Sequence, residues 1–574
     1  MQYKKLAELY EDLNSTTKRL EKIDMLAKFL EKLSAEDREI MYLLEGDIYP
    51  EYDERKIGIS NQLVIKALAK ATGTENRKIV QEWKKIGDIG KVSEQLISKK
   101  KQATLTSKKL LTTEKVLDNF RKLPELEGKG TVDKKLSLIT ELLTSAEPIE
   151  ALYLVRTLIG DLRIGMKEST IRESLAKAFF QKNSKEMADE IQQAIDKSND
   201  LALVFDACKK KNLEELEGIS LQVGKPIKAM LAQKAASVED AFKAVGKPCA
   251  VEYKYDGFRL IIHKKNSEVM LFTRRLENVT KQFPEVKEYI LKNVKGKTFI
   301  LDSEAVGFNK KTKEYTPFQA ISQRIRRKYG IEKMEKELPV EVNVFDILYY
   351  DGKSMLNEPF EKRSKLLRKI VKQQKYKIVC SKQIITSSEK EAKDFYKKAL
   401  KDNQEGAMFK NLHTKYQPGS RVGHMLKLKP SERDLDLVIT GAEYGTGKRS
   451  GWLSSFILSC RGTGKEEEKY LEIGKVGTGI KEKASEGEVN FDKLNELLKP
   501  LIISEKGKSV SIKPKIIVAV TYQEIQHSPN YNSGWALRFP RITALRNDKP
   551  ISETADLDEV EKDFKNQKRN YLYG

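Results

Sequence analysis

The chain has 574 residues, of which 39% are hydrophobic and 33% are charged, and its formal net charge is +23. A chain of this length is expected to fold into about three or four domains with real cores, and its excess of Lys and Arg favours a polyanionic partner, nucleic acid before an anionic membrane surface. The sequence has no lipidation motif and no apolar run long enough to span a bilayer, which argues against a membrane protein.

Residues 1–217 are predicted to form an all-α domain. The segments that begin at Met1 and Val132 repeat apolar residues at steps of three and four, which is typical of amphipathic helices. Glycine and proline are sparse here and lie between these segments. Ser169 opens a further periodic segment, and we expect it to cap a helix.

Residues 218–430 are predicted to form an α+β domain. From about Gly218 onward, alternating β-rich runs replace the helical pattern. The runs that begin at Cys249, Lys297 and Val340 are predicted to be strands that end in turns. A helical stretch that begins at Phe318 lies between two of them.

Residues 431–574 are predicted to form a small β-barrel, because short strand patterns alternate with Gly-rich turns there. A short helix is expected near 557–570. Two glycine clusters, 441–448 and 474–479, are interpreted as turns. In the first, Ala442 stands where a phosphate-binding loop requires its first glycine, and the second lacks the spacing of a dinucleotide-binding motif.

Cysteine and histidine offer little material for a metal centre. The four cysteines lie far apart with no C-x-x-C pair, and none of the four histidines is paired at ligand spacing. A zinc ribbon is therefore disfavoured. We expect an intracellular, cytoplasmic protein with free thiols, and the charged N-terminal segment does not have the pattern of a secretory signal.

The stretch EYKYDGFR, residues 252–259, has the composition of a nucleotide pocket with a nucleophilic lysine. Strand alternation predicts Glu252, Lys254 and Asp256 on one face, and Gly257 lets the chain turn close to a ligand. A lysine amine attacks only when it is neutral, and a nearby cation such as Arg259 or a metal ion lowers its pKa. The alternative interpretation is a charged strand end that turns at the glycine.

Further motifs downstream decide between these interpretations. Asp302 and Glu304 are predicted to lie on one face of a strand, and Lys427 and Lys429 on one face of another. Phe345 carries a ring that can stack on a base. The other members of the series are Arg274, Glu405, Lys410, Arg421, Arg538, Arg541, Arg546 and Lys549.

This ordered set resembles the covalent nucleotidyltransferase superfamily, and in detail the ATP-dependent DNA ligases of the archaeal replicative type. The resemblance covers most of the chain. It implies a helical DNA-binding domain at 1–217, an adenylation domain at 218–430 and an OB-fold domain at 431–574. Two residues depart from the family pattern: Met425 stands where an aromatic is frequent, and Ala229 where a proline is frequent.

The resemblance also implies roles for individual residues. Lys254 matches the lysine that becomes adenylylated, Phe345 the ring that stacks on adenine, and Glu304 the group that holds the ribose. Lys427 and Lys429 match residues that meet phosphates. The remaining positions that match the ATP site are Glu252, Arg259, Arg274 and Arg421, and in the C-terminal motif Arg538 and Lys549. Glu304 and Glu405 match the acidic groups near the magnesium ions.

The implied reaction seals nicks in double-stranded DNA with ATP and Mg²⁺, in DNA replication, repair and recombination. The protein is expected to act as a monomer and to bind DNA without reading its sequence. Family members often dock on the replication sliding clamp through a Gln-containing segment. Here Gln102 and Leu105 lie in the corresponding region, with no aromatic pair after them.

Two other classes of function remain open at this point. An RNA ligase or an mRNA capping-type nucleotidyltransferase shares the lysine motif, although the long helical N-terminal part and the C-terminal motif favour DNA. A non-catalytic nick-binding protein is the second alternative, and the complete set of Lys254, Glu304, Glu405 and Lys427 argues against it. An NAD-dependent ligase is disfavoured, because that family carries a four-cysteine zinc site.

Overall fold

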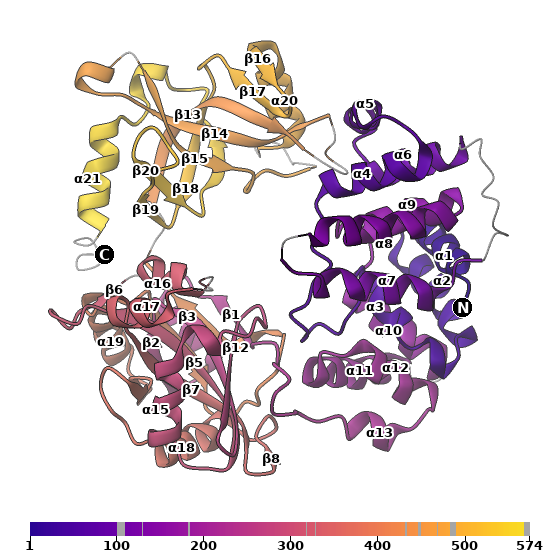
Figure 1. Ribbon diagram of the computed structural model, residues 1–574. Coiled ribbons are helices and arrows are strands. Elements are labelled where there is room, and N and C mark those ends of the chain that lie inside the picture. The colour runs from indigo at the N-terminus through magenta and orange to yellow at the C-terminus, as the bar shows by residue number, and fades with distance from the viewer. Residues whose placement is uncertain are drawn as a thin grey trace. The chain divides into compact units, whose positions relative to one another are not determined.

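The computed structural model describes residues 1–99, 110–128, 130–181, 184–316, 318–325, 327, 329–430, 433–445, 449, 451–467, 469–482 and 489–567. The chain divides into two compact units, residues 1–428 and 429–574. Along the chain, helices come first, then a mixed α and β region, then a β-rich region (Figure 1). This order confirms the predicted fold class.

The N-terminal region is helical, and its central helix is α9. Every residue of α9 from Glu150 to Leu158 is buried, as expected for a helix that is packed on all sides. Ser169 lies inside the first turn of α10, whose N-cap is Lys167, so the prediction that Ser169 caps this helix was wrong. The helices are α1 (Tyr3–Ser15), α2 (Arg19–Lys32), α3 (Ile40–Glu45), α4 (Asn61–Thr72), α5 (Asn76–Ile86), α6 (Ile89–Ser98), α7 (Thr113–Glu125), α8 (Thr131–Ser145), α9 (Pro148–Leu158), α10 (Glu168–Phe179), α11 (Ser184–Ser198), α12 (Leu201–Lys209) and α13 (Leu213–Glu217).

The mixed region contains two sheets. The first has five strands in the order β1-β12-β11-β2-β10, and the second has seven, with β4-β3-β5-β7-β8 as its main path, β6 on β5 and β9 on β7. The strands of the first sheet are β1 (Leu231–Lys234), β2 (Cys249–Lys254), β10 (Gln383–Thr386), β11 (Gly406–Asn411) and β12 (Arg421–Leu428). Those of the second are β3 (Phe258–Lys265), β4 (Glu268–Thr273), β5 (Thr298–Phe308), β6 (Tyr315–Thr316), β7 (Val340–Tyr350), β8 (Lys353–Ser354) and β9 (Ile378–Cys380).

Helices flank these sheets in the sequence, and apolar side chains join the sheets. One core cluster combines Met425 of β12 with Ile261 of β3 and Ile300 of β5, so the two sheets pack face to face through these side chains. The family's frequent aromatic is thus replaced by a buried methionine. The helices are α14 (Val238–Val245), α15 (Pro284–Asn293), α16 (Phe318–Ile325), α17 (Ile331–Glu337), α18 (Phe360–Ile370) and α19 (Glu389–Lys401).

The second unit is β-rich. Strand β13 is central, because it pairs with β14, β17 and β18, and its side chains Leu437 and Ile439 are fully buried. The strands are β13 (Arg433–Tyr444), β14 (Leu453–Arg461), β15 (Tyr470–Val476), β16 (Ile502–Lys506), β17 (Ser509–Ile512), β18 (Ile517–Tyr522), β19 (Glu524–His527), β20 (Trp535–Arg538) and β21 (Arg541–Leu545), and the helices are α20 (Phe491–Leu498) and α21 (Leu557–Gln567).

The structure bears on two expectations from the sequence, one about the cysteine thiols and one about membrane-spanning helices. All four cysteines are buried and none forms a disulfide. No helix in the described ranges combines the length and the apolar character needed to cross a bilayer.

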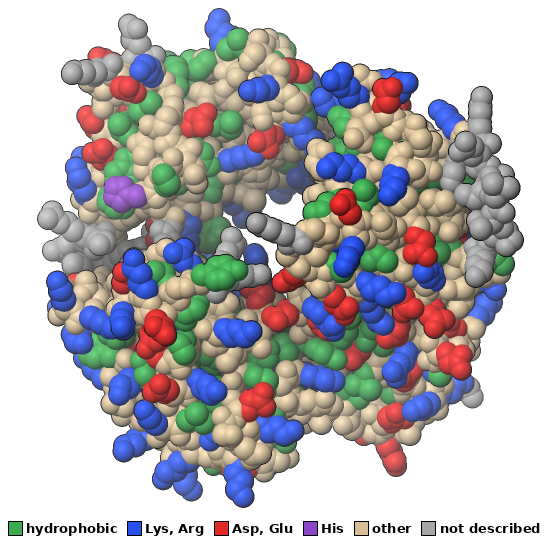
Figure 2. Space-filling view, in the orientation of Figure 1, with side chains coloured by type: hydrophobic (Ala, Val, Ile, Leu, Met, Phe, Trp, Pro, Cys, Tyr) green, Lys and Arg blue, Asp and Glu red, His purple; other side chains and the backbone are tan. Residues whose placement is uncertain are grey.

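Lys and Arg side chains are spread widely over the face drawn in Figure 2, with Asp and Glu between them.

Candidate nucleotide site

Lys254 lies where the chain crosses from one sheet to the other. It is the last residue of β2 in the first sheet, and Phe258 opens β3 in the second. The predicted single strand is thus two strands, and Asp256 lies beyond the end of β2. A Cβ atom on Gly257 would come within 2.3 Å of the Ala305 carbonyl oxygen of β5. Glycine is therefore required here for close approach to the neighbouring strand.

Two carboxylates accompany Lys254. The Lys254 ammonium forms an ion pair with Glu405, and the backbone N–H of Glu405 donates to the Lys254 carbonyl at 2.9 Å. Removal from solvent raises the pKa of Glu304 to about 7, while the cations of Lys254 and Arg259 act in the opposite direction. The lysine and both carboxylates therefore form one electrostatic group.

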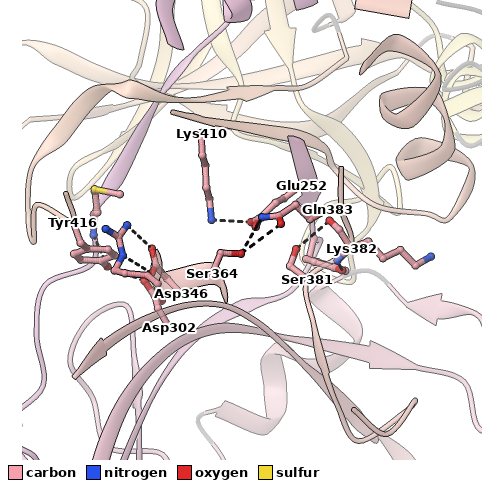
Figure 3. A network of polar contacts seen from close by, with 12 residues as sticks. Glu252, Asp302, Asp346, Ser364, Ser381, Lys382, Gln383, Lys410 and Tyr416 are labelled. Atoms are coloured by element: carbon pink, nitrogen blue, oxygen red, sulfur yellow. Dashed lines mark hydrogen bonds and ion pairs between the residues drawn. The ribbon is translucent and has the colours of Figure 1, made fainter. Parts of the chain in front are cut away.

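Glu252 is fixed by two partners in the same region (Figure 3). Its carboxylate accepts a hydrogen bond from Gln383 Nε2 at 2.7 Å and forms an ion pair with Lys410 Nζ at 2.7 Å. Glu252 and Lys410 are both buried. Two partners on a buried carboxylate compensate its desolvation and fix its orientation.

Phe345 lies between two cations. The Lys410 ammonium is 4.8 Å and the Arg259 guanidinium 5.2 Å from the centre of its ring. Phe345 is partly exposed although its strand neighbours Val344 and Asp346 are buried. Its ring is therefore available at the wall of the site instead of being enclosed in the core.

Arg259 is held by protein groups. Its Nε donates to Asp302 at 2.7 Å, a second nitrogen also donates to Asp302, and Nη1 donates to the Met230 carbonyl at 3.2 Å. Tyr416 donates to the same Asp302 carboxylate at 2.7 Å. This fixed guanidinium supplies positive charge beside Glu304 and Phe345.

The structure gathers Glu252, Lys254, Glu304, Phe345 and Glu405 around the crossing point of the two sheets, with Arg259 beside Glu304 and Phe345. Lys427 is half-buried on β12, opposite Met408, which is opposite Glu252, so it belongs to the same row of the first sheet. Arg421 at the start of β12 and Arg274 after β4 are exposed. Lys429 follows β12 and belongs to the second unit.

The C-terminal motif residues have acidic partners within the second unit. Arg538 pairs with Glu524 at 2.8 Å. Arg546 pairs with Asp436 at 2.8 Å and Lys549 pairs with the same carboxylate at 2.6 Å. These cations are therefore held by their own unit.

Several residues that were not predicted from the sequence hold the site. Gln383 orients Glu252, and Tyr416 orients Asp302. The buried Gln404 accepts the backbone N–H of Asp256 at 3.0 Å and so fixes the turn after the lysine. No sequence signal marks Gln383 or Tyr416, because each acts through a partner more than a hundred residues away. Gln404, directly before Glu405, could have been suspected from that position.

The segment with Gln102 and Leu105 lies outside the described residues.

The donors beside Lys254 suit a hard cation. Glu304 and Glu405 supply carboxylate oxygens, and Mg²⁺ is usually bound through one or two carboxylates together with substrate phosphates. Within the described ranges, no three or more His, Cys, Asp and Glu side chains form a cluster that could hold a metal ion alone. The residues therefore fit a magnesium ion that arrives with a nucleotide and do not form an all-protein cage.

Three family models match the chain in series. Residues 2–176 match the DNA ligase N terminus, residues 229–429 the ATP dependent DNA ligase domain, and residues 449–549 the ATP dependent DNA ligase C terminal region. Together they cover each of the three regions described above. They favour neither an RNA ligase nor a capping-type enzyme.

The chain is also similar to curated proteins over nearly its whole length. It is 43% identical to a DNA ligase of Nanoarchaeum equitans over 569 residues, with 99% of each chain covered. It is 40% identical to a DNA ligase of Methanocaldococcus jannaschii over 589 aligned positions, with 99% of this chain and 100% of the other covered. Among solved structures, the one named "Pmar-Lig_PreS3" aligns with a TM-score of 0.57 at 18% identity, covering 94% of this chain and 99% of that one, which supports the fold.

Proposed function

The chain belongs to the ATP-dependent DNA ligase family, and we propose that it seals nicks in double-stranded DNA through an AMP adduct on Lys254. The observation that carries this assignment is the grouping of Lys254 with Glu405 and Glu304 at the crossing between the sheets. Glu252 and Phe345 line the same region. A nucleophile, two carboxylates and a ring for stacking are the parts that nucleotidyl transfer to a lysine requires.

In the first step, the neutral Lys254 amine attacks the α-phosphorus of ATP. An N–P bond forms, the bond from the α-phosphorus to the bridging oxygen breaks, and pyrophosphate leaves; the lysine gives up a proton. Glu405 and Glu304 are the groups beside the amine and the candidates to receive that proton. Phe345 stacks on the adenine, and the fixed Glu252 carboxylate is an acceptor for its amino group.

In the second step, an oxygen of the nick 5′-phosphate attacks the AMP phosphorus, the N–P bond breaks and the Lys254 amine regains a proton. In the third step, the 3′-hydroxyl oxygen attacks the 5′-phosphorus and gives up its proton to solvent, the bond from that phosphorus to the oxygen shared with AMP breaks, and AMP leaves a continuous strand. Negative charge develops on phosphoryl oxygens in each step. We assign Lys427 and Lys429 to these oxygens, with Arg259, Arg274 and Arg421 as further positive groups around the nucleotide.

Glu304 and Glu405 would hold the Mg²⁺ ion. A bound magnesium ion supplies positive charge that stabilises the phosphoryl oxygens and the pyrophosphate leaving group. Glu405 also forms an ion pair with the Lys254 ammonium, and Glu304 interacts electrostatically with the same cation. The pocket residues therefore position both reaction partners, the amine and the phosphate.

DNA binding is assigned chiefly to the helical region. Helix α5 supports this proposal, because Arg77, Lys78 and Lys84 are exposed on it while Ile79 is its one buried residue. Contacts of such side chains with phosphates carry no sequence preference and weaken with added salt.

One chain carries all the residues that we assign to the nucleotide site, which supports a monomer. Sliding-clamp binding through Gln102 and Leu105 stays a prediction, as does a cytoplasmic location.

The test is to mix the purified chain with α-³²P-labelled ATP and Mg²⁺ and to look for acid-labile label on the protein. We expect label with ATP, no label with GTP, and release of the label as AMP when nicked DNA is added. GTP labelling would indicate a capping-type enzyme. No labelling with either nucleotide, together with tight nick binding, would indicate a non-catalytic protein.

A further inference from the structure

The loop between α19 and β11, residues 402–405, runs along the segment that carries Lys254. It begins where α19 ends, and α19 lies beside β2 (Figure 1). Tyr253 and Tyr255, the two residues that flank the lysine, form one apolar cluster with Ala399 of α19. The helix therefore gives the loop a fixed base directly next to the lysine.

The end of α19 sets the direction of this loop. The backbone N–H of Asn403 donates to the Leu400 carbonyl at 3.1 Å. The backbone N–H of Gln404 donates to the Ala399 carbonyl at 3.0 Å, and Asn403 between them has a φ of +57°. This pair of bonds around a left-handed residue is a Schellman motif, and asparagine adopts the left-handed conformation more readily than most residues. Local backbone geometry thus directs the chain towards the end of β2.

The last two residues of the loop are bonded to the lysine segment. The side-chain oxygen of Gln404 accepts the Asp256 N–H at 3.0 Å, and its amide nitrogen donates to the Asp402 carbonyl at 3.1 Å. Gln404 is only 4% exposed, so loss of these bonds would leave buried polar groups without partners. The backbone N–H of Glu405 donates to the Lys254 carbonyl at 2.9 Å. The loop is therefore attached at the lysine and after it.

The first residue of the loop fixes the strand before the lysine. The Asp402 carboxylate accepts a hydrogen bond from the Tyr253 hydroxyl at 2.9 Å and pairs with Lys382 Nζ at 2.7 Å. The Lys382 carbonyl accepts the Tyr253 N–H at 3.2 Å, and the Lys382 N–H donates to the Tyr255 hydroxyl at 3.0 Å. The residues on both sides of Lys254 are thus held in place.

We propose that Asp402 and Gln404 are positioning residues for the Lys254 nucleophile, because they hold its backbone at a fixed place relative to the Glu405 carboxylate. Attack on phosphorus requires the amine in line with the leaving group, and a small displacement of a reacting group lowers the rate strongly. A lysine side chain is long and flexible, so a fixed backbone limits where its amine can lie. This inference rests on the proposed function and adds to it the loop that orients the nucleophile.

The first experiment compares Gln404→Met with Gln373→Met. Methionine is close to glutamine in length but has no amide, and Gln373 also accepts a backbone N–H in the same unit, that of Cys380 at 3.1 Å. Two rates are measured in the full chain. Self-adenylation at saturating ATP uses the Lys254 amine, whereas sealing of a nick that already carries AMP on its 5′-phosphate does not. We expect Gln404→Met to lower adenylation about 10- to 100-fold with little change in sealing, and Gln373→Met to change neither rate.

The ratio of the two rates within one protein decides the outcome, since unfolded protein lowers both rates alike. A ratio that falls in Gln404→Met and stays at the wild-type value in Gln373→Met supports the proposal. A wild-type ratio in Gln404→Met overturns it, whether both rates are kept or both fall together with the melting temperature. An equal change of the ratio in the two variants overturns it as well. Failure of the proposed function is distinguishable, because the wild-type chain would then form no lysine–AMP adduct.

The second experiment tests the other end of the loop. Asp402→Leu removes the acceptor of the Tyr253 hydroxyl, whereas Asp402→Asn keeps an oxygen that can accept it. We expect the Leu variant to lower adenylation about fivefold without a change in sealing, the Asn variant to keep most of the rate, and Tyr253→Phe to resemble the Leu variant. In the double variant Tyr253→Phe/Asp402→Leu, the loss should not exceed that of Asp402→Leu alone. Losses that multiply would show that the two side chains act independently and would overturn the role of Asp402.

Discussion

The charged side chains of the pocket around Lys254 and those of the C-terminal motif differ in their ion-pair partners. In the pocket, the lysine, two carboxylates and a fixed arginine lie together. In the motif, Arg546 and Lys549 share Asp436, and Arg538 has Glu524. The charged groups of the pocket are thus paired around the lysine, whereas these three cations of the motif are paired with carboxylates of their own unit.

This difference suggests a division of labour between the steps. A pre-assembled pocket costs no reorganisation at the moment of reaction, so it suits groups that act in every step. Cations that must exchange one anion for another suit a group that is needed only while pyrophosphate is present.

The largest effect is expected at Lys254. Lys254→Ala should abolish the protein–AMP adduct, because Lys254 is the amine that the structure pairs with Glu405 at the crossing between the sheets. Lys254→Arg should fail as well, since a guanidinium stays protonated and cannot attack. Gel detection of labelled protein measures both. Normal labelling of either variant would place the nucleophile elsewhere and end the view of a pocket assembled around Lys254.

The second largest effect is expected in the motif, and it should be selective for the first step. Arg538→Ala or Lys549→Ala should lower self-adenylation by roughly 30- to 1,000-fold, the equivalent of about 2–4 kcal/mol of transition-state stabilisation. Sealing of a pre-adenylated nick should change little, because pyrophosphate has already left. The ratio of the two rates in each variant is the measurement. If both rates fall together, the motif serves DNA binding or folding instead.

A smaller effect is expected from Gln383, which holds Glu252 at 2.7 Å. Gln383→Leu should raise the KM for ATP about tenfold with little change in kcat, because it loosens the orientation of the carboxylate without touching the reacting atoms. Ile385→Ser is the matched control, since Ile385 lies two residues along the same strand and is 55% exposed. A changed kcat at unchanged KM would contradict a role confined to base recognition.

The sequence predicted the order of domains and the strands that carry the site. Apolar and polar residues alternate clearly within short segments such as that from Val340 to Tyr350, and this pattern depends on neighbouring residues only. It did not predict that the lysine motif joins two different sheets, since a turn at Gly257 fixes no strand partner. It also could not predict Gln383 or Tyr416, whose roles arise from side-chain contacts across more than a hundred residues. The paired state of Arg546 and Lys549 was missed for the same reason.

The smallest effect on the reaction is expected from His263. This residue is expected instead to make the stability of the unit 1–428 depend on pH. His263 lies on β3 and is fully buried; its Nδ1 accepts the Gly224 N–H at 3.0 Å. Burial lowers its pKa from 6.5 to about 3, so the folded state keeps it neutral while the unfolded chain takes up a proton below pH 6.5. Its contribution to stability is therefore complete above pH 6.5 and is lost progressively as the pH falls from there towards 3. At pH 5 the loss should be about 2 kcal/mol.

Calorimetry should show that the unfolding temperature of residues 1–428 falls between pH 7 and pH 5. His263→Gln, which keeps an acceptor but cannot titrate, should reduce this slope at the cost of some stability at every pH. His413→Gln, at an exposed histidine of the same unit, should leave the slope as it is. Adenylation at pH 7 should be nearly unchanged in all three proteins. An equal pH slope in His263→Gln and the wild type would mean that other buried groups cause the acid sensitivity of the unit that carries Lys254.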